Sequence, residues 1–175
     1  MNSTNQTIKN FIELLDLAPL AREGGYFKET YRSGITLEGG ALGSRYGEVK
    51  SISTCIFYLL TPDSFSQLHR LISDEIYHFY VGDPVDLINI DRDGQLTTTV
   101  LGSDVLAGQA PQKVVPQMVW QGSRLRPGGR FALMGLTVAP GFDFSDYENG
   151  EREALIRQYP QHMETIVRYT REVAP

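Results

Sequence analysis

Apolar and polar residues alternate with a period of two over most of the chain between residues 24 and 140, which is the pattern of half-buried β-strands. The strand candidates are residues 26–32, 51–60, 66–71, 76–81, 85–91, 95–101, 113–115, 118–121 and 130–138. Turn signals separate them, such as Asp-Arg-Asp-Gly at 91–94, where glycine supplies the positive φ of a tight connection. Many short strands with regular turns predict a sandwich or a barrel.

Helical spacing replaces this alternation at both ends of the chain. Ile8, Phe11, Ile12 and Leu15 predict an amphipathic helix that packs against the body, with Thr4, Asn5 and Thr7 available as caps. Residues 151–159 and 161–171 show two more helical patterns, separated by a proline.

Between the strands, residues 34–48 are glycine-rich and lack periodicity, which predicts a hairpin or a loop. Residues 142–148 form an acidic segment that either covers an opening or leads into the following helix. Because no repeat or linker is visible, we expect one domain over 1–175, helical at about 5–17, a β-barrel at about 24–140 and helical again at about 145–171.

Charge and composition exclude several classes of function. The chain has 16 Lys and Arg against 21 Asp and Glu, a net charge of -5, so it lacks the basic surface that nucleic acid or an anionic membrane requires. No run approaches the roughly 20 apolar residues that span a bilayer, and we expect a cytoplasmic protein. Cys55 is the only cysteine, which excludes an internal disulfide and a cysteine-rich zinc site.

The stretch from residue 66 to residue 82 holds the strongest candidate chemistry. Alternation places Gln67, His69 and Leu71 on one face of a strand. A short link, residues 72–75, then turns the chain into the next strand, which ends at Gly82. This predicts a hairpin that brings His69 close to Glu75.

This hairpin resembles the first motif of the cupin superfamily. His69 stands at the first histidine of that motif, Glu75 at its carboxylate and Gly82 at its closing glycine. Leu71 replaces the second histidine, and Asp63 replaces the leading glycine.

The second cupin motif is echoed at residues 116–121, with Met118 in place of its glycine and Gln121 in place of its histidine. Two of the family's four metal ligands are therefore missing. Longer blocks at 24–33, 53–60, 76–84 and 138–148 look like the RmlC-like cupins of uncharacterised function, and the resemblance runs from about Ile8 to Thr170. It implies an all-β protein with flanking short helices, built as a double-stranded β-helix (the cupin jelly-roll barrel), that forms a homodimer.

The resemblance also implies a pocket floored by His69, Glu75 and Gln121. We expect it to bind a carbohydrate-like or nucleotide-sugar ligand, with His69 as the base of an isomerase or epimerase. Glu75 can hold the imidazolium, take a proton itself or complete a metal site, unless it is a solvated turn residue. A metal-dependent oxygenase or isomerase and a non-catalytic ligand-binding or storage-like cupin are the alternatives.

Four further residues are candidate ligand contacts: Gln67, Tyr58, His78 and Trp120. Trp120 is favoured because it adjoins Gln121, although alternation also allows it to face away. No motif identifies a tyrosine as the catalytic acid. We expect no cofactor, because the chain offers too few converging donors, and a divalent metal at His69 and Glu75 is the alternative.

Overall fold

The computed structural model describes residues 3–43, 46–47 and 49–172. Its strands are β1 (Ala18–Pro19), β2 (Tyr26–Arg32), β3 (Thr36–Leu37), β4 (Lys50–Ser51), β5 (Thr54–Leu60), β6 (Ser66–Leu71), β7 (Asp74–Gly82), β8 (Val85–Ile90), β9 (Leu96–Leu101), β10 (Gln112–Val115), β11 (Trp120–Leu125), β12 (Ala132–Ala139) and β13 (Tyr147–Asn149). The α-helices are α1 (Ser3–Leu14), α2 (Arg152–Gln158) and α3 (Met163–Arg168). Short 3-10 helices are η1 (Gly39–Leu42), η2 (Val105–Ala107), η3 (Phe144–Asp146) and η4 (Pro160–His162).

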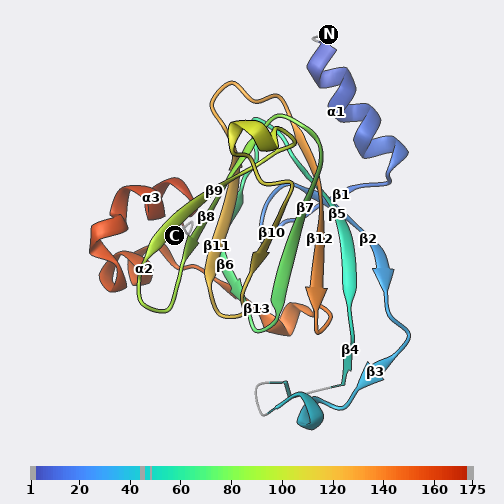
Figure 1. Cartoon of the computed structure of the whole chain (residues 1–175), viewed down its shortest axis with the longest axis vertical. Helices are drawn as coiled ribbons and strands as arrows, with labels where there is room; N and C mark the ends of the chain where they lie inside the picture. The colour runs from blue at the N-terminus through green and yellow to red at the C-terminus, as the bar shows by residue number, and fades with distance from the viewer. Residues whose placement is uncertain (1–2, 44–45, 48, 173–175) are drawn as a thin grey trace.

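Two antiparallel sheets face each other and enclose the main core (Figure 1). One sheet has the order β1-β2-β5-β12-β7-β10, and the other has the order β13-β6-β11-β8-β9. Inward side chains of both sheets meet between them, among them Tyr77 and Met134 from the first and Leu87 and Leu125 from the second. This confirms the predicted all-β barrel with short flanking helices.

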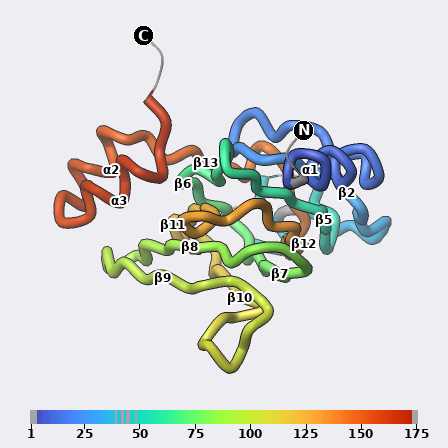
Figure 2. The backbone as a smooth tube through the Cα atoms, turned by 90° about the horizontal axis from the view of Figure 1, so that it is seen from above, coloured from blue at the N-terminus to red at the C-terminus, as the bar shows by residue number. Residues whose placement is uncertain are grey.

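The helices cover the outside of the barrel at two separate places (Figure 2). Helix α1 packs Phe11 and Ile12 against Leu59 and Leu133 of the first sheet. Helices α2 and α3 bury Leu155 and other apolar side chains against the outer face of the second sheet. No helix among the described parts of the chain is long and apolar enough to cross a membrane.

Several predicted boundaries shift in the structure. Helix α1 begins at Ser3 and ends at Leu14, so the residues expected to cap it lie inside it. The predicted strand 51–60 divides into β4 and β5, and β4 pairs with β3 in an arm that projects from the barrel (Figure 1). The link expected at 72–75 is shorter, because β7 already begins at Asp74. The predicted hairpin is wrong, because β6 pairs with β11 and β13 in one sheet while β7 pairs with β10 and β12 in the other. Strand β13 was not predicted.

Candidate functional site

A cavity of about 150 Å³ opens between the two sheets. Its walls are apolar and include Leu71, Leu136 and Val138, and its polar groups come from His69, Glu75 and several residues that the sequence did not indicate. A mostly apolar hollow with a few converging polar groups is the usual form of a small-molecule site.

His69 lies on β6 with its side chain only 2% exposed. Its Nδ1 lies 2.8 Å from the backbone oxygen of Gln67, and because a carbonyl only accepts, Nδ1 carries the proton. The Nε2 of the neutral ring is therefore free of a proton. It lies 4.0 Å from Oε2 of Glu75 and 4.0 Å from Oε2 of Glu23, while the ring stacks on Tyr147 at a centroid distance of 5.0 Å.

Glu75 is a buried strand residue and not a solvated turn residue. Its Oε2 accepts a hydrogen bond of 2.7 Å from Nε2 of Gln121 on the facing sheet. Burial, reinforced by the negative charge of Glu23, raises the pKa of Glu75 to about 8, and the hydrogen bond from Gln121 opposes this shift. Near neutral pH, Glu75 therefore holds its proton.

Glu23 is the third polar group of the floor, and sequence reasoning missed it. It precedes β2, and its Oε1 accepts a hydrogen bond of 2.5 Å from the hydroxyl of Ser66. Gly24, at φ 113°, allows the chain to pass so close to β6 that a Cβ there would lie 2.1 Å from the backbone oxygen of Phe65. The glycine pair at 24–25 was the one available signal.

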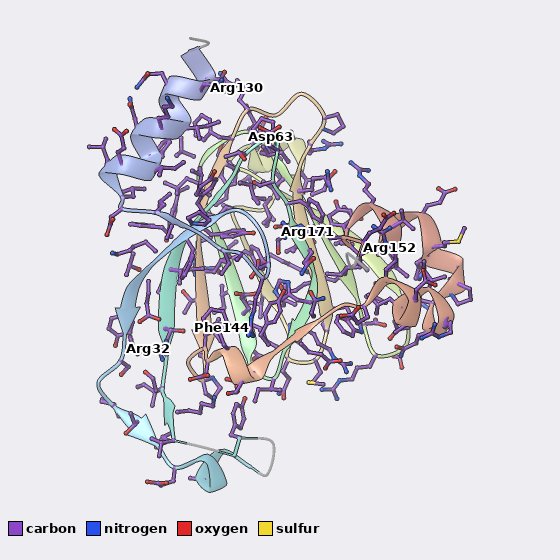
Figure 3. The ribbon with its side chains drawn as sticks, turned by 180° about the vertical axis from the view of Figure 1, so that it is seen from behind. Arg32, Asp63, Arg130, Phe144, Arg152 and Arg171 are labelled. Atoms are coloured by element: carbon purple, nitrogen blue, oxygen red, sulfur yellow. The ribbon has the colours of Figure 1, made fainter. Side chains whose placement is uncertain are left out.

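The mouth of the cavity is formed partly by the segment between β12 and β13. Phe142 and Phe144 line the cavity together with Arg22 and Arg32. Figure 3 shows Phe144 and Arg32 toward the same end of the barrel. The acidic segment at 142–148 thus lies at the opening, which is one of the two places predicted for it.

A buried ion pair holds this segment in place. The Nζ of Lys50 contacts both carboxylate oxygens of Asp146 at 2.7 and 2.8 Å. On the opposite side, the guanidinium of Arg32 bonds Glu29 and the backbone oxygen of Phe142. The mouth therefore has a defined shape.

Two predicted ligand contacts, Gln67 and Tyr58, lie next to the site but not in the cavity wall. Gln67 lines an adjacent, more open recess with Arg22, Tyr147 and Asn149. Tyr58 is buried in the main core, and its hydroxyl donates a hydrogen bond of 2.9 Å to the backbone oxygen of Gly24. Its contact supports the loop that carries Glu23.

The other two predicted contacts, Trp120 and His78, lie outside the cavity lining. Trp120 faces away from Gln121 and packs into the core beneath α2 and α3, where the guanidinium of Arg70 lies 4.5 Å from its ring centroid. His78 alternates with the buried Tyr77 and lies on the outer side of its sheet, 3.1 Å from the hydroxyl of Thr137. Neither residue reaches the cavity.

The residues present do not fit the metal centre that the fold family implies. Leu71 lines the cavity without offering a donor atom, and Gln121 directs its amide nitrogen at Glu75. Within the described ranges, no group of three or more His, Cys, Asp or Glu is placed to hold a metal ion.

Comparison with known proteins indicates one family for this chain. Residues 9–149 match the sequence model of a family described as "Cupin superfamily (DUF985)". Over 135 residues the chain is 38% identical to an uncharacterised protein of Saccharomyces cerevisiae, covering 72% of this chain and 67% of the yeast protein.

Solved structures agree with this match. A hypothetical protein from Leishmania major superposes with a TM-score of 0.84 at 32% identity, covering 94% of this chain and 98% of the other. Oxalate decarboxylase from Bacillus subtilis superposes with a TM-score of 0.54 at 14% identity, covering 89% of this chain and 37% of the other. This second likeness shows the fold alone.

Proposed function

We propose that the cavity of this chain, which belongs to the cupin superfamily in the family described as DUF985, binds a small carbohydrate-like molecule. In this proposal His69 and Glu75 move a proton on the bound molecule, as in an isomerase or epimerase. The observation that carries this proposal is the meeting, within 4.0 Å, of the unprotonated Nε2 of His69 and the carboxyl of Glu75. Glu75 supplies a protonated acid near neutral pH, and Nε2 is the nitrogen of the neutral His69 ring that can accept a proton.

The size of the cavity limits the ligand. About 150 Å³ is less than the roughly 300–1,000 Å³ of a typical drug-sized site. A single sugar ring or a molecule of similar size is the largest group we expect to enter. If the ligand is a nucleotide-sugar, its remaining part lies outside, where Arg22 and Arg32 flank the opening.

The proposed step is proton abstraction beside a carbonyl. Nε2 of His69 takes the proton from the carbon, the electron pair of that C–H bond moves toward the carbonyl, and its oxygen becomes the enol oxygen by accepting the proton of Glu75. Return of a proton to the opposite face of the same carbon inverts it, and return to the neighbouring carbon isomerises the molecule. The charge of Glu23, also 4.0 Å from Nε2, stabilises the imidazolium formed in between.

Exchange of substrate hydrogen with deuterated solvent tests this step without requiring that the product be known. The protein is incubated in D₂O with a panel of aldoses, ketoses and keto-sugar nucleotides, and deuterium incorporation is followed by NMR and mass spectrometry. We expect exchange with at least one compound and a loss of about 100-fold or more in His69→Ala, which is the usual scale of general base catalysis.

His78→Ala is the matched control, because His78 occupies a neighbouring strand but faces away from the cavity. It should exchange at the rate of the unmodified protein. Exchange that survives in His69→Ala contradicts the proposal. Saturable binding without any exchange would instead favour the non-catalytic alternative, and exchange that requires an added divalent metal would favour the metal-dependent one.

A further inference from the structure

A separate recess of about 220 Å³ lies at the other end of the barrel from the cavity mouth. It is bounded by the loop of Pro62 and Ser64, by the turn between β11 and β12, and by the end of α3. Figure 3 shows this separation, with Asp63 of that loop at one end and Phe144 of the cavity mouth toward the other. The two hollows share no lining residue.

Three arginines line this recess: Arg124, Arg126 and Arg168. One carboxylate meets them, because Nε of Arg126 lies 3.3 Å from Oδ1 of Asp86. Over residues 3–43, 46–47 and 49–172, no carboxylate forms an ion pair with Arg124 or Arg168. Three positive charges against one negative charge leave an excess of two, in a chain whose net charge is -5.

The guanidinium of Arg124 is held in position before any ligand arrives. It stacks over the ring of Phe65 at 4.1 Å, and its Nη2 donates a hydrogen bond of 2.9 Å to the backbone oxygen of Arg168. Its Nε is buried and has no hydrogen-bond partner among the described residues.

The turn between β11 and β12, which faces the arginines, leaves the recess open. Gly128 adopts φ 84°, and a Cβ there would meet no atom within 4 Å. Pro127 and Gly129 complete this wall, so no long side chain fills the space between the turn and the arginines. Asp63 and Arg171 do not line the recess. Because their charges are opposite, they leave the net charge around the recess unchanged.

We propose that this recess is a binding site for a phosphate-class dianion, either free phosphate or the phosphoryl group of a small phosphomonoester. Guanidinium groups match the oxygens of phosphate with paired N–H donors, and an excess of two positive charges matches a dianion. The site is independent of the chemistry proposed for His69.

Titration calorimetry with inorganic phosphate and with methyl phosphate, at constant ionic strength, tests the site. The test variant is the double substitution Arg126→Gln/Arg168→Gln. The control is Arg92→Gln/Arg157→Gln, which removes the same charge from two arginines outside the recess. Amide NMR of Gly128 and Gly129 during the same titration locates the bound ion.

We expect saturable binding that the test variant weakens by about tenfold or more and the control variant by less than about twofold. The amide signals of Gly128 and Gly129 should shift with the same saturation. Preference for methyl phosphate would identify a phosphomonoester as the ligand, and equal affinity would identify the free ion. Absence of saturable binding, equal weakening in both variants or shifts confined to the cavity mouth would overturn the proposal.

Discussion

Gln121 donates a hydrogen bond of 2.7 Å to Glu75, and this bond joins the two facing sheets at the floor of the cavity. The bond favours the ionised form of Glu75, but burial outweighs it and keeps the pKa near 8. The protonation of Glu75 is therefore coupled to the stability of the barrel.

Stability should fall as the pH rises from about 4.5 to about 8. In this window the folded chain holds a proton on Glu75 that the unfolded chain has released, because the ordinary pKa of a glutamate is 4.5. The full loss is on the order of 5 kcal/mol. Glu75→Gln cannot ionise and keeps a group that Gln121 can bond, so it should remove most of this decline.

Urea unfolding at pH 5, 7 and 9 measures the effect. Glu148→Gln is the control, because Glu148 is a half-exposed carboxylate paired with Arg70 at the surface. That variant should retain the decline. An equal decline in Glu75→Gln and in the unmodified protein would show that other groups cause it.

Substitution of Gly24 by alanine should cost more stability than the same substitution at Gly108, which also has a positive φ. Gly24→Ala places a Cβ against the backbone oxygen of Phe65, whereas Gly108→Ala, at φ 82°, meets no atom within 4 Å. We expect a cost of about 1 kcal/mol at Gly108 from backbone strain alone and of more than about 2 kcal/mol at Gly24. Denaturant unfolding of both variants compares them, and equal costs would contradict the close approach that positions Glu23.

Met118 adopts φ 64°, at the position where the second cupin motif has glycine. Met118 therefore holds a conformation that glycine, the residue of the motif at this position, adopts without strain. Met118→Gly should therefore be more stable than Met118→Ala by about 1 kcal/mol, a reversal of the usual order of these two residues. Thermal unfolding measures the difference between the variants, and greater stability of the alanine variant would show that position 118 relaxes out of this conformation.

The sequence located His69 and Glu75 because the motif is local. Both residues lie on consecutive strands, β6 and β7. These strands belong to the two facing sheets and form no hairpin, but alternation directs both side chains into the space between the sheets. Alternation also places Trp120 and Gln121 on opposite faces of their strand, but it does not predict which of the two faces the interior of the barrel. The core beneath α2 and α3 decides this, because Trp120 completes it.

Glu23 could not be found in the same way. Its place beside His69 depends on the bend at Gly24 and on the contact with Ser66, which lies far along the chain. The arginine recess likewise draws Arg126 from a turn and Arg168 from a helix. Contacts between distant segments leave no periodic pattern in the sequence, so only the fold reveals them.

Metal content separates the proposed proton-transfer site from a metal-dependent cupin. Elemental mass spectrometry on untagged protein, purified without chelator and soaked with Fe(II), Mn(II), Zn(II) or Ni(II), should find far less than one metal per chain, and His69→Ala and Glu75→Ala should not change the value. The physical reason is the donor set: Leu71 offers no ligand atom, Gln121 is engaged with Glu75, and a metal would have to displace the proton that Glu75 holds up to about pH 8. Near-stoichiometric metal that both variants lose would contradict this prediction and establish His69 and Glu75 as ligands.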